Sequence, residues 1–312
     1  MSLAFLFPGQ GSQRAGMGKA LSEAFSESRA AYAAADEALG SPLSKLCFEG
    51  PDAELTLTAN TQPAILATSV AALRALEARG VRPDFVAGHS LGEYSAMVAA
   101  GVLRLEEAVL AVRRRGSYMQ EAVPVGAGAM AAILGLELPE IEEACHEAAA
   151  GEVVAPANVN SPGQVVIAGH AAAVLRASAA CKARGAKRAM PLPVSAPFHC
   201  ELMRPAQERM QADLAALAFA DAARPVVRNV DAREVRRADE CRDGLVRQVA
   251  APVLWQQSVE RLAALGVTTF VEVGPGSVLS GLVRKISKQA RVLNVEDPAS
   301  LDKTLQALGG VA

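Results

Sequence analysis

The segment GHSLG at residues 88–92 restricts the possible folds of this chain more than any other feature. It follows a short apolar run, residues 84–87, that is typical of a buried strand, and the residues after Leu91 carry apolar side chains at helical spacing. A serine between two glycines at such a junction is the G-x-S-x-G nucleophile elbow, whose sharp turn exposes the hydroxyl above the sheet. The following helix directs free N–H groups toward whatever is bonded to Ser90. The pattern predicts an α/β fold and a nucleophilic serine.

Length and composition fit a globular protein with a sizeable core. The chain has 312 residues, 51% hydrophobic and 21% charged, with a formal net charge of −2. This balance provides no general attraction to nucleic acid or to an anionic membrane, so neither is an expected partner. The N-terminal apolar run is too short for a signal peptide, and no apolar stretch is long enough to span a bilayer. The five scattered cysteines form no C-x-x-C pair, which is typical of reduced thiols in a cytoplasmic protein and indicates no zinc site.

Strands and helices alternate along most of the chain, which predicts a mostly parallel sheet covered on both faces. The expected strands are residues 3–7, 84–87, 225–230, 269–273 and 291–295, and the expected helices are 17–38, 63–79, 105–122, 200–217, 241–248, 255–265, 278–286 and a last one after Pro298. Residues 127–194 instead follow the order βαββαβ of a ferredoxin-like unit. The predicted architecture is a large α/β hydrolase-like domain, residues 1–126 and 195–312, with a small ferredoxin-like domain, residues 127–194, inserted into it.

A serine hydroxyl needs a neighbouring base to become a good nucleophile, and the chain has four histidines. His89 precedes Ser90 in the elbow, so its side chain should point away from the hydroxyl. His146 lies in an expected helix of the insert, and His170 follows a strand where it could cap the next helix. His199 lies in a proline-containing turn just after the insert and is the favoured base. The alternative is that His199 is merely a residue at the start of a helix.

A tetrahedral intermediate also needs two preorganised donors for its oxyanion. In elbow enzymes one is the N–H of the residue after the nucleophile, here Leu91, and the other comes from a loop after an early strand. The loop PGQGSQ at residues 8–13 follows the first expected strand, and its glycines allow the backbone of Gln10 to approach closely. A phosphate-cradling loop is the alternative, but the segment lacks both the full G-x-G-x-x-G pattern and a G-K-[ST] ending.

Three successive arginines, residues 113–115, lie on the helix after the elbow. A charge run is usually a solvated helix face. Three neighbouring residues of a helix cannot all point one way, however, so one guanidinium could face the cleft and hold a substrate carboxylate in a bidentate pair. The residues alone leave both possibilities open.

Five motifs occur in order along the chain: FPGQGSQ at residues 7–13, GHSLGEYS at 88–95, RG at 115–116, FH at 198–199 and VGPG at 273–276. Together they resemble the malonyl-CoA:acyl carrier protein transacylase family of bacterial fatty-acid synthesis, and the resemblance covers essentially the whole chain. It implies that Ser90 forms the acyl-enzyme, that His199 is its base and that Arg115 binds the malonyl carboxylate. It also implies that the backbone N–H groups of Gln10 and Leu91 form the oxyanion hole.

The resemblance further implies how the base is held and how the acyl group is selected. In this family a backbone carbonyl steers the histidine, a departure from the Ser-His-Asp arrangement, and Gln248 matches the position that supplies it. Phe198 before the base and Leu91 after the nucleophile favour malonyl over methylmalonyl. Asn160 lies in a segment, residues 158–164, that is similar to the family's cleft-lining strand.

The implied reaction is a ping-pong transfer of malonyl from malonyl-CoA to the thiol of holo-acyl carrier protein, without a metal or redox cofactor. The cleft should limit attack by water. The enzyme is expected to be a monomer, with acyl carrier protein and CoA as its partners. Because carrier proteins are acidic, docking is expected on basic residues near the cleft rim, namely Lys182, Arg184, Lys187, Arg188, Arg284, Lys285 and Lys288.

Three other interpretations use the same residues. A thioesterase or lipase-like hydrolase could share the elbow, although a simple ester pocket gains nothing from a buried cation such as Arg115. The acyltransferase subunit of malonate decarboxylase would perform the same chemistry with another carrier. A non-catalytic carrier-binding module would keep the fold, but it has no physical need of Ser90, His199 and Arg115 together.

Overall fold

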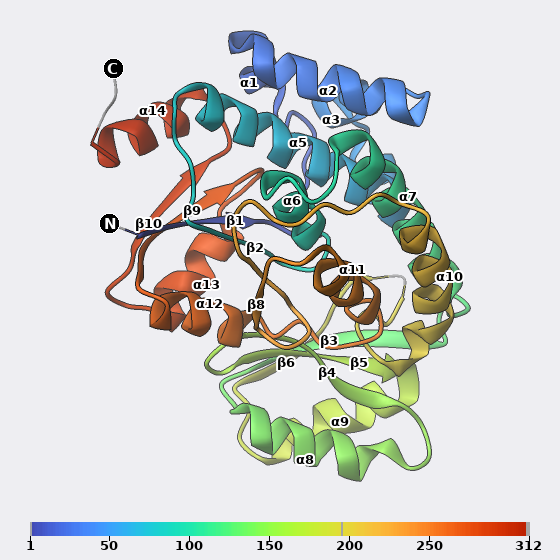
Figure 1. Ribbon diagram of the computed structural model, residues 1–312. Helices are drawn as coiled ribbons and strands as arrows, with labels where there is room; N and C mark the ends of the chain where they lie inside the picture. The colour runs from blue at the N-terminus through green and yellow to red at the C-terminus, as the bar shows by residue number, and fades with distance from the viewer. Residues whose placement is uncertain (1, 195, 310–312) are drawn as a thin grey trace.

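Figure 1 shows the computed structural model of the chain, which describes residues 2–194 and 196–309. Positions 1, 195 and 310–312 lie outside the described residues. They include the two outermost ends of the expected large domain and the position where that domain is expected to resume after the insert. Within the described ranges, no helix is long and apolar enough to cross a membrane. The described residues form two β-sheets, one of six strands and one of four.

The larger sheet has the strand order β10-β9-β1-β2-β7-β8, and all neighbouring strands are parallel except β7 and β8. Its strands are β1 (Ser2–Phe7), β2 (Phe85–Gly88), β7 (Val226–Val227), β8 (Glu234–Val235), β9 (Val267–Val273) and β10 (Arg291–Val295). Side chains of β1 alternate between two apolar clusters, with Phe5 and Phe7 in one and Leu6 in the other. Both faces of the sheet are therefore buried, which confirms the predicted mostly parallel sheet.

Helices cover both faces of the larger sheet (Figure 1). One face is covered mainly by α2 (Ser26–Leu39), α5 (Thr58–Ala78), α6 (Gly92–Ala99) and α7 (Leu105–Glu121), and the other by α12 (Trp255–Ala264) and α13 (Val278–Ile286). The remaining helices around this sheet are α1 (Lys19–Ala24), α3 (Leu43–Glu49), α4 (Asp52–Leu55), the short 3₁₀ helix η1 (Glu201–Met203), α10 (Arg204–Ala215), α11 (Ala238–Arg247) and α14 (Pro298–Ala307).

The smaller sheet is antiparallel throughout and has the strand order β4-β5-β3-β6. Its elements are β3 (Gly128–Leu134), α8 (Leu138–Ala149), β4 (Val154–Ser161), β5 (Gln164–His170), α9 (Ala171–Ala183) and β6 (Arg188–Pro191), in the ferredoxin-like order βαββαβ. Figure 1 places α8 and α9 on the face away from the larger sheet. The segment before α12 binds the smaller sheet through Val253, whose N–H donates to Ala157 and whose carbonyl accepts from Val159, both at 2.9 Å.

Several elements differ from the sequence predictions. The helix expected over residues 17–38 is broken at Phe25, whose extended backbone (φ −129°, ψ 126°) separates α1 from α2, and the Arg79 guanidinium lies 4.1 Å from its ring. Helix α5 begins at Thr58 and contains Pro63, which the prediction placed at the helix start. The strand expected over 225–230 is only two residues long, because the chain leaves the sheet and carries Asn229 to the elbow. Helices α3 and α4 and strand β8 were not predicted.

Candidate active site

The elbow between β2 and α6 depends on two close backbone approaches. Ser90 has a positive φ of 54°, which raises its hydroxyl above the edge of the sheet. A Cβ on Gly88 would lie 1.9 Å from the carbonyl oxygen of Gly92, and a Cβ on Gly92 would lie 2.1 Å from that of Phe7. Only glycine fits at either position, so the two glycines of the motif are a geometric requirement of the turn.

This requirement predicts a large loss of stability for Gly92→Ala. The new methyl group would collide with a strand backbone that cannot rotate away, so we expect the free energy of unfolding to fall by about 3 kcal/mol or more. Thermal unfolding measures the change. Gly281→Ala in α13 is a matched control, because no atom lies within 4 Å of its added Cβ and alanine favours a helix. Equal melting temperatures for the two variants would contradict the packing argument.

The expected nucleophile and the expected base are in direct contact. Ser90 Oγ lies 2.7 Å from His199 Nε2, and His199 Nδ1 lies 3.0 Å from the backbone carbonyl oxygen of Gln248. Because a carbonyl oxygen can only accept, Nδ1 carries the proton and Nε2 is free to accept the hydroxyl proton. Burial and, as a second cause, the positive charge of Arg115 together lower the pKa of His199 to about 3, so the imidazole is neutral at neutral pH.

Arg115 supplies a buried positive charge beside the nucleophile. Its guanidinium donates from Nη2 to Ser90 Oγ at 3.1 Å and to Gln248 Oε1 at 2.8 Å, and from Nη1 to Gln62 Oε1 at 2.9 Å. The residue is only 1% exposed, burial lowers its pKa, and no described residue forms an ion pair with it. A buried cation held only by neutral oxygens is costly unless a ligand brings the missing negative charge.

The structure resolves which of the three arginines faces the cleft. Arg113 donates to Asn60 Oδ1 at 2.6 Å, and Arg114 lies 3.4 Å from Asp213 at the surface. Arg115 alone of the three points at Ser90.

The loop after β1 lies beside the elbow. Strands β1 and β2 are parallel neighbours with Phe7 opposite Gly88, so the loops that follow them meet at the same edge of the sheet. A Cβ on Gly9 would lie 2.6 Å from the carbonyl oxygen of His89, which shows how closely the two loops approach. Gln10 and Leu91 both line the cavity at Ser90, an arrangement that suits two backbone donors for an oxyanion.

The cavity at Ser90 has a volume of about 130 Å³. It is far smaller than the roughly 300–1,000 Å³ of pockets that hold drug-sized ligands, so it suits a short acyl group. The small sheet closes one side with Met130. The apolar wall also includes Met119, Leu192, Val194 and Phe198. Strand β4 contributes Asn158 to the cavity wall.

Asn160, on the same strand, instead accepts at Oδ1 a hydrogen bond from His89 Nε2 at 2.9 Å. The side chain of His89 is thus directed at the small sheet and not at the Ser90 hydroxyl. His170 occupies the N-cap position of α9, as the sequence suggested, but its side chain makes no capping hydrogen bond, because its Nδ1 accepts from the N–H of Val153 at 2.9 Å. His146 is exposed on α8.

Two residues that the sequence interpretation left without a role lie directly behind the elbow. Asn229 accepts from the Ser90 N–H and donates to the Gly88 carbonyl, both at 2.7 Å, so it spans the strained turn. Glu93 is buried on α6 and accepts from the side chain of Gln248 at 2.8 Å. An acidic residue in an otherwise apolar helix was the available signal for Glu93. Asn229 follows a short apolar run, and only the sheet order brings it beside β2.

Comparison with known proteins decides the family. Residues 4–305 match a family model described as an acyl transferase domain. The malonyl CoA-acyl carrier protein transacylase of Bacillus subtilis (strain 168) is 49% identical over 307 residues, covering 98% of this chain and 97% of that protein. The transacylase of Escherichia coli (strain K12) is 51% identical over 304 residues, covering 97% and 98%. The chain belongs to the malonyl-CoA:acyl carrier protein transacylase family.

Solved structures of this family share the fold along the whole chain. The acyl carrier protein S-malonyltransferase of Vibrio cholerae superposes with a TM-score of 0.96 at 48% identity, covering 97% of this chain and 100% of that one. A malonyl-transacylase solved in complex with a type II PKS acyl-carrier protein has a TM-score of 0.96 at 47% identity, covering 98% and 100%. The predicted family and fold class are confirmed.

Proposed function

We propose that this chain transfers the malonyl group of malonyl-CoA to the pantetheine thiol of acyl carrier protein through a malonyl-Ser90 intermediate. It thereby acts as an [acyl-carrier-protein] S-malonyltransferase that supplies malonyl-carrier protein for fatty-acid synthesis. One observation carries the proposal: the buried Arg115 guanidinium, without an ion-pair partner among the described residues, lies 3.1 Å from Ser90 Oγ. An acyl group with a free carboxylate provides the charge that this site lacks.

In the first half-reaction, His199 Nε2 takes the Ser90 proton as Oγ attacks the thioester carbon of malonyl-CoA. The negative charge on the carbonyl oxygen is stabilised by the backbone N–H groups of Gln10 and Leu91. The Gln248 carbonyl holds the Nδ1–H of the imidazolium. Collapse of the intermediate breaks the C–S bond, and Nε2 returns the proton to the departing CoA sulfur.

The second half-reaction runs the same steps in reverse with a different thiol. His199 Nε2 takes the proton of the carrier pantetheine, whose sulfur attacks the malonyl ester carbon. The C–O bond to Ser90 then breaks, and its Oγ recovers the proton. Arg115 keeps the malonyl carboxylate in place throughout, so the ester carbon stays aligned for the incoming thiol.

The low pKa of His199 predicts a flat pH profile on the acid side. The imidazole is already neutral at pH 7 and stays neutral down to its folded pKa of about 3, so the base is not lost by protonation. We expect kcat/KM for malonyl loading of Ser90 to change less than about twofold between pH 7.5 and 5.5. Rapid-quench loading with malonyl-CoA measures it, with circular dichroism to verify folding at each pH. A fall with a midpoint near 6.5, the ordinary histidine value, would show that His199 titrates normally.

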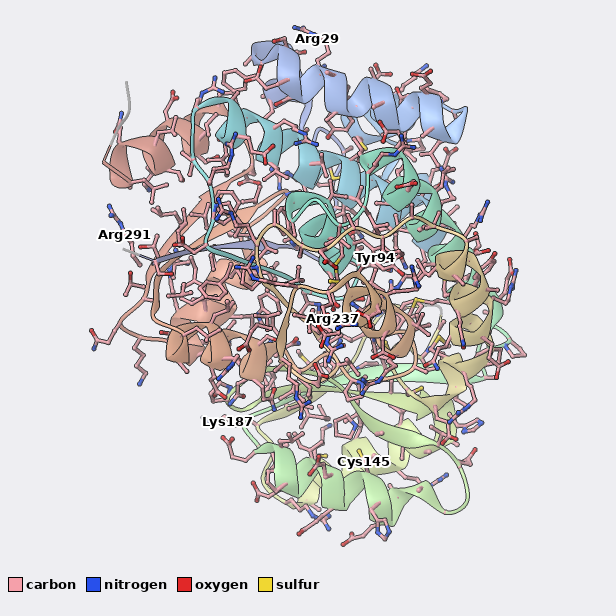
Figure 2. All side chains as sticks on the ribbon, in the orientation of Figure 1. Arg29, Tyr94, Cys145, Lys187, Arg237 and Arg291 are labelled. Atoms are coloured by element: carbon pink, nitrogen blue, oxygen red, sulfur yellow. The ribbon has the colours of Figure 1, made fainter. Side chains whose placement is uncertain are left out.

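We further propose that the carrier docks on the basic residues where α13 meets the small sheet. Lys285 Nζ on α13 lies 2.9 Å from Gln164 Oε1 at the start of β5, and Lys187 lies at the neighbouring sheet edge (Figure 2). Arg184 is a weaker candidate, because it is paired at 2.6 Å with Glu147 on the outer helices.

Lys285→Glu is therefore expected to raise the KM for acyl carrier protein about fivefold and to leave that for malonyl-CoA nearly unchanged. Steady-state kinetics with each substrate varied in turn measures the effect. Lys303→Glu on the distant helix α14 is the control for a change in net charge. Equal effects of Lys285→Glu on both substrates would refute this docking site.

The same proposal divides the chain into a large domain, residues 1–126 and 195–312, and an insert, residues 127–194. It also includes a monomeric state and a cytoplasmic location. The ferredoxin-like element order of the insert supports its treatment as a separate unit. Light scattering of the purified chain tests the monomer directly.

A further inference from the structure

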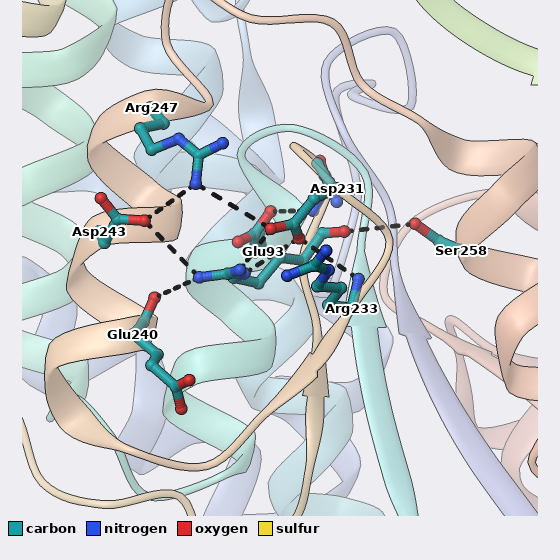
Figure 3. A network of polar contacts seen from close by, with 9 residues as sticks. Glu93, Asp231, Arg233, Glu240, Asp243, Arg247 and Ser258 are labelled. Atoms are coloured by element: carbon teal, nitrogen blue, oxygen red, sulfur yellow. Dashed lines mark hydrogen bonds and ion pairs between the residues drawn. The ribbon is translucent and has the colours of Figure 1, made fainter.

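Glu93 is a fully buried carboxyl group placed three residues after the nucleophile, on the first turn of α6. Its Oε2 accepts two hydrogen bonds, from Gln248 Nε2 at 2.8 Å and from the backbone N–H of Asn229 at 2.9 Å. Figure 3 shows Glu93 at the inner end of a polar network that continues outward through Asp231, Asp243 and Arg247. In the mechanism above, Glu93 touches neither the acyl group nor the base.

Glu93 determines which way the side-chain amide of Gln248 faces. Oε2 only accepts, so the NH₂ group of Gln248 must face Glu93, and the same group donates to the Ser90 carbonyl at 3.0 Å. The amide oxygen is thereby directed at Arg115 Nη2, 2.8 Å away. In the flipped orientation the NH₂ group would face a guanidinium, which has no acceptor, and the oxygen would face two other oxygens.

Protonation of Glu93 does not change this orientation of the Gln248 amide. Burial raises the pKa of Glu93 to about 7, while its hydrogen bonds and the charges of Arg228 and Arg115 oppose the rise. Its Oε1 has no hydrogen-bond partner among the described residues. Because two N–H groups already donate to Oε2, a proton bound by Glu93 is carried on Oε1, and Oε2 remains an acceptor in both states.

We propose that Glu93 is a positioning residue, which supports the acyl-carboxylate site without touching the acyl group. By fixing the amide of Gln248, it holds the Arg115 guanidinium beside Ser90, where it meets the carboxylate of the acyl group. Its bond to the Asn229 backbone supports the side chain that spans the elbow. This inference rests on the proposed malonyl transfer, because it assigns Glu93 a share in recognising the malonyl carboxylate.

The test compares Glu93→Met, which removes the acceptor at similar length, with Glu93→Gln, which retains an oxygen acceptor. Rapid loading of Ser90 is measured with malonyl-CoA and with acetyl-CoA, which lacks the carboxylate. Glu93→Met should lower kcat/KM for malonyl-CoA about tenfold more than for acetyl-CoA, mainly through KM, and Glu93→Gln should restore most of the difference. Equal losses with both substrates, or no rescue by Gln, would overturn the proposal.

Glu272→Met is the matched control for removing a buried carboxylate. Glu272 is equally buried, accepts from the N–H groups of Leu279 and Ser280 at 3.0 and 2.7 Å, and lies away from the cavity. Glu272→Met should change the stability of the protein without changing the ratio of kcat/KM for malonyl-CoA to kcat/KM for acetyl-CoA. If Glu93→Met does not fold, Gln248→Met breaks the same link and keeps the backbone carbonyl for His199, so it must produce the same selective loss. An unchanged ratio in Gln248→Met would overturn the proposal.

The proposed function and the role of Glu93 can be refuted separately. If the unmodified protein does not load malonyl at Ser90, the proposed function is wrong. If it loads malonyl and the variants keep the ratio of the two substrates, only the role of Glu93 is wrong.

Discussion

Ser90→Ala and His199→Ala are each expected to lower kcat for malonyl transfer by about 10⁴–10⁶-fold. The alanine at 90 removes the atom that carries the acyl group. The alanine at 199 removes the one side chain among the described residues that contacts Ser90 Oγ as a base, at 2.7 Å. Because the two groups act as one unit, the double variant should be little worse than either single variant.

Transfer of radiolabelled malonyl from CoA to holo-carrier protein measures these losses. His146→Ala is the control, because this histidine is exposed on α8 and takes no part in the site. Multiplicative losses in the double variant would show that Ser90 and His199 act independently, contrary to the geometry.

Arg115→Ala is expected to lower kcat/KM for malonyl loading by about 10²–10³-fold and to leave slow acetyl loading much less affected. The variant removes the proposed partner of the carboxylate, and the charge is worth more here because the guanidinium is buried. Arg115→Lys should recover only part of the loss, because an ammonium cannot hold Gln62, Gln248 and a carboxylate with the fixed fork of a guanidinium.

Arg114→Ala is the matched control, since it removes a neighbouring arginine of the same helix that pairs with Asp213 at the surface. Stopped-flow loading with malonyl-CoA and acetyl-CoA measures both variants. Equal losses of kcat/KM with the two thioesters would mean that Arg115 supports the fold of the site and does not bind the carboxylate.

The residues with strong local signals were predictable from sequence. The elbow at Ser90 depends on two glycines and a strand-to-helix junction, which are visible in five letters. The sheet order then explains why the loop with Gln10 lies beside it, because β1 and β2 are neighbours. The choice of Arg115 among three arginines came from the resemblance, since the charge run itself was equally consistent with a solvated face.

The roles of Asn229 and Glu93 were not predictable, because they arise from contacts between distant segments, whereas the backbone carbonyl of Gln248 was expected from the resemblance. Asn229 reaches the elbow across 139 positions of sequence, and Gln248 reaches Glu93 across 155. The break at Phe25 has a similar cause: a contact with Arg79 competes with local helix propensity, which is a weak preference. Sequence patterns therefore indicated the reacting groups, and the tertiary structure showed what holds them in place.

The most direct test of the malonyl-serine mechanism is the intact mass of the protein after brief mixing with malonyl-CoA. We predict a mass increase of one malonyl group that is absent in Ser90→Ala, and that holo-carrier protein removes faster than water does. An unmodified protein that still releases CoA, or an adduct that persists in Ser90→Ala, would contradict the mechanism.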